Sequence, residues 1–302
     1  MIRDRHIHEV KQATSLRFSE LWKRNFNSNK NAILRNQGVA ALRDRFKGTP
    51  SIVVGAGPSL DKNIALLQRS ADKALIISSD AALKPLLRRG VKPSVVVCLD
   101  PQEEISKFFK GTPSRNMLLV APSIVHPRAL DCWEGSVVFY NKHAPDIPVL
   151  TEIQRLIPNI GVLTPGGTVL SVAYDLAFQS GSNPIIFVGQ DLSWTTPKTH
   201  SRNSEMEDND FTETLHRQKD NIVNETDLFG RTRPTLKCMS VSKEWFYWAF
   251  SNWNRKQPTR ILNCSESGIL MEHCTVMPLR EALNQYCRKT INVAWTLKKA
   301  LK

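Results

Sequence analysis

The sequence predicts an α/β fold: a Rossmann-like, doubly wound and mainly parallel sheet, preceded by an N-terminal helical extension. Three observations lead to this prediction. From Ser51 onward, short apolar runs alternate with helical segments. Several runs are apolar at every position, as in parallel strands that are covered on both faces. The first run, Ser51–Val54, leads directly into a turn that contains Gly55 and Gly57, and such turns mark the ligand edge of open α/β sheets.

The N-terminal extension is predicted to span residues 1–48. Apolar side chains such as Trp22, Phe26, Leu42 and Phe46 recur at roughly helical spacing. The sequence Gly48-Thr49-Pro50 then ends the helical pattern. We expect this extension to pack on the main domain or on a partner.

The main domain is predicted to cover residues 49–285. Its expected strands are Ser51–Val54, Ala74–Ser78, Ser94–Leu99, Met117–Ala121, Ser136–Tyr140, Gly161–Leu163, Ile185–Val188 and Arg260–Asn263. Its expected helices are Leu60–Arg69, Ala81–Arg89, Thr168–Gln179 and Ser240–Asn254.

Two further segments differ in pattern from this alternation. Between Trp194 and Thr235 the apolar period disappears, and a loop of that length is typical of a lid, a binding loop or a disordered segment. Because it follows a strand directly, we expect residues 194–235 to form a lid over the ligand edge. Residues 286–302 are rich in lysine and arginine and are expected to form a basic C-terminal helix or tail.

Composition narrows the class of protein. The chain has 302 residues, which is enough for one large domain or two smaller ones. No apolar run reaches the roughly 18 residues that span a bilayer, and the N-terminus lacks the apolar region of a signal peptide. The sequence therefore predicts a cytoplasmic chain with no membrane span.

The net charge of +13 indicates an anionic partner or substrates that carry phosphate or carboxylate groups. The positive charge is dispersed, and no helix-turn-helix, zinc-finger or RNP-type pattern is present, so we do not expect specific nucleic-acid binding. The six cysteines are scattered without a C-x-x-C pair, which favours reduced, structural thiols and no metal site.

The glycine turn is the first candidate site. Gly55 and Gly57 lack a Cβ, so the backbone can turn tightly and approach a ligand, and its N–H groups can bind an anion. The natural ligand is a nucleotide phosphate. The turn matches neither the dinucleotide-binding G-x-G-x-x-G nor the P-loop, and close strand–helix packing alone remains an alternative.

Polar groups follow four of the predicted strands. They are Asp80, Asp100, the turn Gly166-Gly167-Thr168, and the sequence Gly189-Gln190-Asp191. Because parallel strands end at one edge, we expect these groups to converge with the glycine turn. The alternatives are that Asp80 and Asp191 are helix caps or turn formers and that the second glycine turn serves packing.

The predicted lid holds two candidate general bases. His200 lies at its start, close to the expected ligand edge, and His216 lies further along. The sequence alone does not choose between them.

Taken in order, the motifs resemble the DUF115 family. They are Gly55 through Asp61, Asp80-Ala81-Ala82-Leu83, Leu99-Asp100-Pro101-Gln102, Pro165-Gly166-Gly167-Thr168, Val188-Gly189-Gln190-Asp191-Leu192 and Lys198-Thr199-His200. The family includes the motility accessory factors (Maf), which are flagellin glycosyltransferases, and the MptE-like 6-hydroxymethylpterin diphosphokinases of archaea. The resemblance covers roughly residues 45–285, and the same turns are also similar to those of bacterial sialyltransferases.

The resemblance implies a nucleotide-sugar-dependent glycosyltransferase that transfers a nonulosonic acid, inverting its anomeric centre, from a CMP donor to a protein hydroxyl such as a flagellin Ser or Thr. It implies His200 as the base and Asp191 as a second catalytic residue that orients the ribose or the cytosine. Nucleotide binding falls to Gly55, Ala56, Gly57, Pro58, Ser59, Asp80, Asp100, Gly166, Gly167, Thr168, Gly189 and Gln190. Lys198, Arg202 and Arg231 are possible supplementary ligands for phosphate or a sugar carboxylate.

The two branches of the family imply different needs for metal. The glycosyltransferase branch implies no cofactor beyond the donor substrate. The diphosphokinase branch implies Mg²⁺ and ATP, with an Asp-x-Asp pair after the third strand. Here Cys98 occupies the first of those positions and only Asp100 remains, which favours the motility-factor branch. A diphosphokinase and a nucleotide-binding accessory protein without turnover remain the alternatives.

Overall fold

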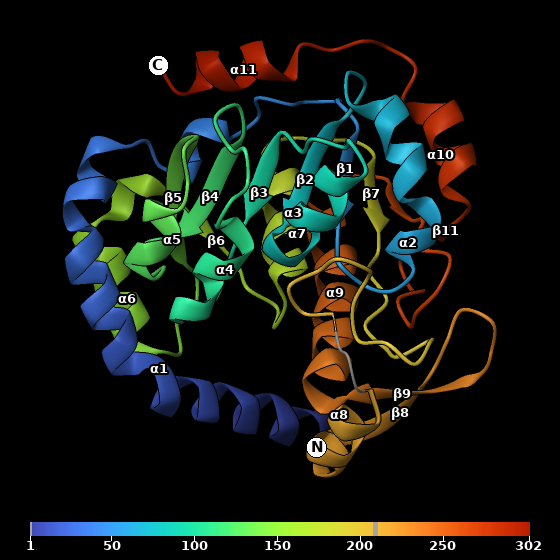
Figure 1. The fold of residues 1–302 in the computed structure, drawn as a ribbon. Coiled ribbons are helices and arrows are strands. Elements are labelled where there is room, and N and C mark those ends of the chain that lie inside the picture. Colours follow the sequence, from blue (N-terminus) through green and yellow to red (C-terminus); the bar gives the residue numbers. More distant parts are fainter. Residues whose placement is uncertain (1, 208–210) are drawn as a thin grey trace.

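The computed structural model describes residues 2–207 and 211–302, and in them the chain forms one large parallel sheet (Figure 1). The strand order in this described part is β11-β10-β7-β1-β2-β3-β4-β5-β6. The strands are β1 (Ser51–Val54), β2 (Leu75–Ser79), β3 (Val95–Val97), β4 (Leu118–Pro122), β5 (Ser136–Lys142), β6 (Val162–Leu163), β7 (Ile185–Val188), β10 (Ile261–Asn263) and β11 (Thr275–Val276). The predicted α/β, Rossmann-like fold is confirmed.

Every strand predicted for this sheet is present, with ends that differ by at most two residues. The register explains why the glycine turn and the acidic residues meet, because β1 pairs with β2 on one side and with β7 on the other. The sheet reverses direction of winding between β1 and β7, and ligands of open α/β sheets bind at such a point. Strand β11 has two exposed residues and was not predicted.

The four predicted helices correspond to α2 (Leu60–Asn63), α3 (Asp80–Arg88), α7 (Val169–Gln179) and α9 (Lys237–Asn254). The prediction of one helix over Leu60–Arg69 is wrong in detail, because α2 ends after one turn and a 3₁₀ helix, η2 (Ile64–Ser70), continues the segment. Further helices in the described part are α4 (Ser106–Phe109), α5 (Pro127–Asp131), α6 (Pro148–Leu156), α10 (Leu279–Tyr286) and α11 (Val293–Ala300), with 3₁₀ turns η1 (Val39–Leu42), η3 (Glu103–Ile105) and η4 (Pro158–Ile160).

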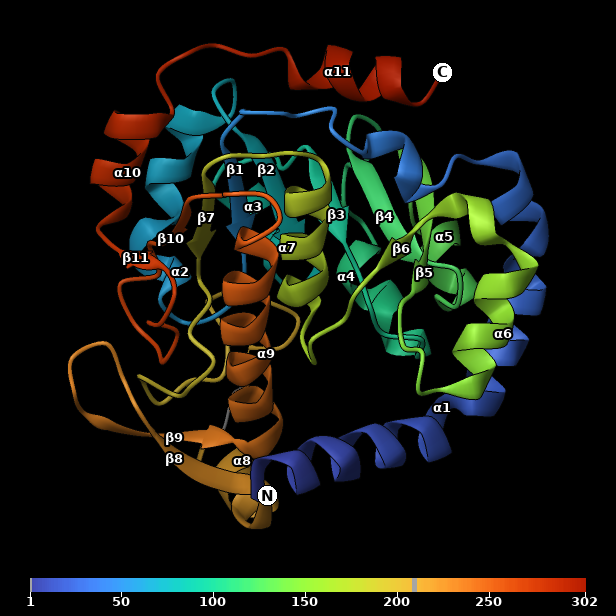
Figure 2. The ribbon, with the colours of Figure 1, turned by 180° about the vertical axis from the view of Figure 1, so that it is seen from behind.

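Helices cover both faces of the sheet, as expected for a doubly wound fold. Within β1, Val53 faces the layer of α7 and α9, whereas Ile52 and Val54 face α2 and α10. Figure 2 shows α7 and α9 in front of the sheet, and Figure 1 shows α2, α3, α4 and α5 on the other side. Both faces are therefore apolar, which explains the unbroken apolar runs.

The N-terminal extension is a docked part of the fold. Helix α1 (Ile2–Arg35) buries Trp22 and Phe26 against the β4–β5 side of the sheet. Asn25 and Asn29, also buried, donate hydrogen bonds to backbone carbonyls of the strand-end loops, including Pro101 O at 2.8 Å. Beyond this region α1 runs toward α8 (Phe211–Gln218), below the carboxyl ends of the strands (Figure 1). The helix therefore forms part of the wall at the ligand edge.

The expectation that residues 194–235 form a loop without regular structure is wrong, whereas their role as a lid stays a prediction. The segment contains α8 (Phe211–Gln218), the 3₁₀ turn η5 (Lys219–Asn221) and an antiparallel hairpin of β8 (Ile222–Thr226) and β9 (Thr232–Leu236). Residues 208–210 lie outside the described part. The hairpin turn is held by Asp227, whose carboxylate accepts hydrogen bonds from the backbone N–H groups of Phe229 and Arg231. Turns of this kind are stabilised by the side chain of a nearby Asp, so they form without an apolar period in the sequence.

The predicted tail of residues 286–302 contains α11, whose Leu297 packs in the same core as α7 and α9. None of the helices in the described part of the chain is both long and apolar enough to cross a bilayer.

Candidate functional site

A cavity of about 630 Å³ lies at the carboxyl ends of the strands. Loops after β1, β2, β3 and β7 line it, together with the start of α7 and parts of α1 and α8. All of the predicted site residues except Ser59 and Gly166 line this pocket. The strand-end groups therefore converge, although what each binds stays a prediction.

The ends of β1 and β7 touch at their glycines. Gly57 N donates to Gly189 O at 2.9 Å, and a Cβ on Gly55 would lie 2.5 Å from the same oxygen. Gly189 has φ of +69°, a left-handed conformation that favours glycine. The close approach of these two backbones forms the floor of the pocket beside Ala56 and Pro58.

Asp191 holds the glycine turn in place. Its carboxylate accepts a hydrogen bond from Ser59 N at 2.9 Å and a second one from Ser59 Oγ. Burial raises the pKa of Asp191 to about 6, and the hydrogen bonds from Ser59 act in the opposite direction. The side chain therefore positions the start of α2, and this explains why Ser59 lies behind the pocket surface.

The second glycine turn opens α7 toward the pocket. Gly166 N donates to Ser171 Oγ at 2.6 Å, and a Cβ on Gly166 would overlap the ring of Trp245, so this glycine serves packing. Gly167 has φ of +95° and lines the pocket. The hydroxyl of Thr168 is buried and has no hydrogen-bond partner among the residues described. A helix N-terminus with a bare hydroxyl suits an oxyanion.

Asp80 and Asp100 follow β2 and β3, and they place two carboxyl groups in the lining of the pocket. Asp80 is 5% exposed and accepts a hydrogen bond from Ala81 N at 2.7 Å. Burial, with a smaller contribution from the charge of Asp100, raises the pKa of Asp80 to about 7. Asp100 is exposed and accepts a hydrogen bond from Gln102 N.

The raised pKa of Asp80 makes folding stability depend on pH. The folded state keeps the carboxyl proton of Asp80 up to about pH 7, whereas the ordinary pKa of an aspartic acid is 3.8. The free energy of unfolding therefore falls as the pH rises between those two values. At 1.36 kcal/mol per pKa unit the loss reaches about 4 kcal/mol. Asp80→Asn removes the charge, keeps the Ala81 acceptor and is expected to raise Tm at pH 7.5 but not at pH 4.

This prediction is checked by calorimetry of Asp80→Asn between pH 4 and 7.5. The exposed Asp72 provides the matched control, because Asp72→Asn changes the net charge equally without relieving burial. Equal Tm gains in both variants would mean that overall charge, and not the burial of Asp80, sets the pH dependence.

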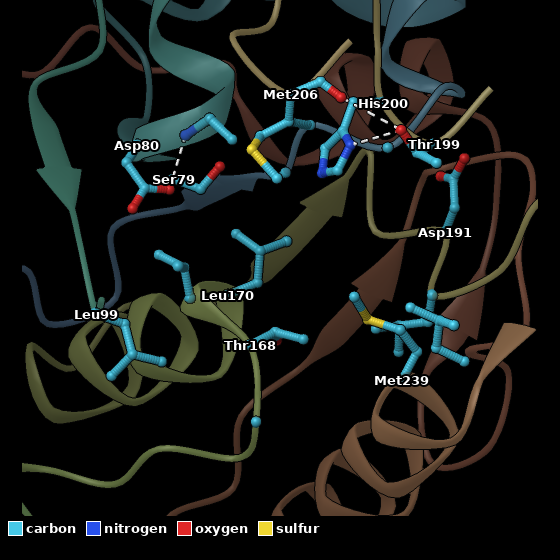
Figure 3. Close-up of a pocket in the computed structure, with 18 of the residues that line it drawn as sticks. Ser79, Asp80, Leu99, Thr168, Leu170, Asp191, Thr199, His200, Met206 and Met239 are labelled. Atoms are coloured by element: carbon cyan, nitrogen blue, oxygen red, sulfur yellow. Dashed lines mark hydrogen bonds between the residues drawn. The ribbon is translucent and has the colours of Figure 1, made fainter. Parts of the chain in front are cut away.

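The ring of His200 is positioned by a hydrogen bond to its neighbour Thr199. Its Nδ1 lies 3.1 Å from Thr199 Oγ1, which donates its proton to Met206 O at 3.3 Å. With the Thr199 proton directed at Met206 O, this arrangement is compatible with the tautomer that carries its proton on Nδ1. Figure 3 shows the ring turned into the pocket, between Asp80 and Asp191 in this view. His216 lies on α8, is exposed and does not line the pocket.

The segment that carries His200 is fastened to the glycine turn and to α3. Ser201 N donates to Ala56 O at 2.8 Å, and Ser204 Oγ donates to Ala81 O at 3.0 Å. Glu205 forms an ion pair with Lys84 of α3. These contacts hold residues 199–207 across the glycine turn. The folded chain therefore keeps this segment in the position of a closed lid.

Lys142 and Trp22 are two of the pocket residues that the sequence reasoning missed. Lys142 ends β5, and its place after a predicted strand was the same signal that identified Asp80 and Asp100. Trp22 comes from α1, and nothing in the sequence indicated that this helix reaches the strand ends. Gln190, which was predicted, has a buried Nε2 without a partner in the described ranges, as does the indole N–H of Trp22.

The three side chains that were predicted as supplementary ligands form ion pairs with acidic side chains of the protein instead. Lys198 pairs with Glu207 at 3.6 Å, Arg202 with Asp61 at 3.8 Å and Arg231 with Asp227 at 3.0 Å. None of these three lysine and arginine side chains lines the pocket.

Comparisons with known proteins identify a family and a fold. The family model described as 6-hydroxymethylpterin diphosphokinase MptE-like matches residues 24–197. A curated protein of Treponema pallidum (strain Nichols), named only as an uncharacterized protein, is 30% identical over 161 residues, which are 51% of this chain and 27% of that protein. The structure of the MAf glycosyltransferase from Magnetospirillum magneticum AMB-1 matches with a TM-score of 0.60 and 22% identity.

The match to that glycosyltransferase covers 87% of this chain and 40% of the solved chain. The matched part of this chain therefore covers about a quarter of the curated relative and less than half of the solved chain. At this identity the structural match establishes a shared fold.

Proposed function

The chain belongs to the 6-hydroxymethylpterin diphosphokinase MptE-like family, and from that premise we propose that it is a nucleotide-sugar-dependent glycosyltransferase of the motility accessory factor type. Its donor would be a CMP-linked nonulosonic acid, and its acceptor a protein hydroxyl such as a flagellin Ser or Thr. The observation that carries the proposal is one pocket that joins two glycine turns to the ring of His200. The shared fold with a MAf glycosyltransferase supports it.

The proposed reaction is a single displacement. The acceptor oxygen attacks the anomeric carbon, its proton passes to His200 Nε2, and the bond from that carbon to the phosphate oxygen of CMP breaks. The N–H groups at the start of α7, beside Thr168, stabilise the departing phosphate. CMP leaves as a stable anion, so the reaction needs no strong acid and, in this proposal, no metal.

The alternative is an Mg-ATP-dependent 6-hydroxymethylpterin diphosphokinase, which the family description favours. Mg²⁺ prefers oxygen ligands. After β3, however, the position two residues before Asp100 is Cys98, which is fully buried, and burial raises the pKa of its thiol well above the usual range. Asp80 and Asp100 remain as carboxylates, and this pair fits Mg²⁺ less well than an Asp-x-Asp pair at one strand end.

Thermal stabilisation by nucleotides distinguishes the candidates. We expect CMP and CTP, at 100 times their Kd, to stabilise the protein by about 2.7 kcal/mol with or without EDTA. Stabilisation by ATP alone, and only with Mg²⁺, would contradict the transferase and favour the diphosphokinase. Binding of a cytidine nucleotide without consumption of any CMP-sugar would favour a nucleotide-binding accessory protein.

A further inference from the structure

Two lysine or arginine side chains line the pocket in the part of the chain that the structure describes: Lys142 and Arg217. They differ in their surroundings. Arg217 lies on the exposed surface of α8, whereas Lys142 is half-buried at the end of β5. A half-buried ammonium needs a partner, because removing it from water is costly.

Lys142 has little to compensate its charge. Its Nζ lies 5.3 Å from the centre of the Trp22 ring, a cation–π contact. The described ranges contain no carboxylate within ion-pair distance of this ammonium and no hydrogen-bond acceptor for it. Burial lowers the pKa of Lys142 to about 8, although the nearby charge of Asp100 acts in the opposite direction. The three donors of this ammonium are thus available to a ligand.

Lys142 also lies far from the glycine turn. In the sheet order β1-β2-β3-β4-β5, four strand spacings separate it from Gly55. At about 4.8 Å per spacing, the backbone of Lys142 lies roughly 19 Å from the backbone of the glycine turn. It lies roughly 14 Å from the backbone of Asp80 at the end of β2. The start of α7 adjoins the same turn, because a Cβ on Gly55 would lie 2.5 Å from Leu170 Cδ1. A phosphate bound between the glycine turn and the start of α7 is therefore out of reach of Lys142. Lys142, Trp22 and Phe18, which also lines the pocket from α1, form a second compartment, here called the α1 compartment.

The family match begins at residue 24, so Phe18 and Trp22 lie outside it. Their rings stack with centroids 6.1 Å apart, and this aromatic pair in the middle part of α1, here called the aromatic roof, lines the pocket. The excess charge of +13 on the whole chain favours acidic partners over basic ones. An anionic group that reaches the α1 compartment would meet an unpaired ammonium below the aromatic roof.

We propose that the α1 compartment binds the acceptor polypeptide through an acidic side chain, which pairs with Lys142 while the acceptor hydroxyl lies near His200. This inference rests on the proposed glycosyl transfer. An extended chain advances about 3.3 Å per residue, so an acidic residue three positions from the hydroxyl lies about 10 Å along the backbone, and the two side chains cover the rest of the roughly 14 Å of sheet between Asp80 and Lys142. The recognised feature is therefore Ser or Thr followed or preceded, three residues away, by Glu or Asp.

The test compares two peptides, acetyl-Ser-Ala-Ala-Glu amide and its Gln counterpart, titrated calorimetrically into protein saturated with CMP. We expect the wild-type chain to bind the Glu peptide about tenfold more tightly, the effect of one charge-assisted hydrogen bond. The preference should disappear in Lys142→Met and remain in Lys142→Arg. Lys110→Met, which removes an exposed lysine at the end of α4, should leave it unchanged.

The outcomes separate this inference from the proposed function. If CMP binds but Lys142→Met keeps the Glu preference, or if wild type shows none, the inference is overturned and the transferase is not. If N-acetylneuraminate binds in a Lys142-dependent way, its methyl ester does not, and neither peptide does, the compartment takes a sugar acid and the peptide inference is overturned. Absence of CMP binding is a failure of the proposed function. Equal Tm values of Lys142→Met and Lys142→Arg show that a difference in peptide binding between these variants does not come from a difference in folding.

Discussion

Replacing His200 with alanine is expected to lower kcat for transfer from a CMP-sugar by about 10²–10⁴, the usual contribution of a positioned general base. CMP affinity should be unchanged, because His200 lies on the fastened segment of residues 199–207 and the proposed phosphate ligands are backbone groups of other loops. The measurement is CMP release in steady state, paired with a CMP titration of the same protein.

The matched control is His216→Ala, which removes an exposed histidine of α8 from the neighbouring part of the chain. It should keep wild-type kcat. A companion variant, Thr199→Val, removes the acceptor for Nδ1–H and releases the tautomer, so kcat should fall and the acid limb of its pH profile should move. Full activity of His200→Ala would exclude this residue as the base.

The sheet was predictable because its signals are local. Parallel strands such as β1 and β7 are buried on both faces, so they appear in the sequence as unbroken apolar runs. Their ends were marked by Gly55 and Gly189, where the backbones of two strands come into contact. Convergence of Asp80 and Asp100 on the same edge followed from parallel topology alone.

The missed parts depend on contacts between distant segments. Trp22 reaches the pocket because α1 docks along its length through Asn25 and Asn29, and these hydrogen bonds to strand-end carbonyls leave no periodic signal. The hairpin β8–β9 has half-exposed strands, so its apolar alternation is weak. The role of Asp191 was open for a related reason, because a carboxylate that holds Ser59 and one that faces a ligand look alike in sequence.

Gly189→Ala is expected to destabilise the chain by about 3–5 kcal/mol, a large share of the 5–15 kcal/mol typical of domains. Two effects add. The residue has φ of +69°, which costs an L-residue about 1–2 kcal/mol. Its new Cβ would also overlap Gly55 O, a backbone atom that cannot move without displacing β1. CMP binding should be lost with the glycine turn, and Tm should fall by at least about 6 °C.

A second glycine separates the two effects. Gly111 has φ of +73°, and no atom lies within 4 Å of the position that a Cβ would take there, so Gly111→Ala carries the conformational cost without the overlap. Its Tm should fall only by the amount that about 1–2 kcal/mol produces, and its CMP affinity should equal that of wild type. The difference in Tm between the two variants then measures how much stability depends on the close approach of β1 and β7. If both variants lose the same stability, the contact between Gly55 and Gly189 is relaxed at little cost, and the glycine turn is not fixed by that contact. If only Gly189→Ala loses stability and CMP affinity together, the contact that closes the sheet is also the one that shapes the nucleotide site.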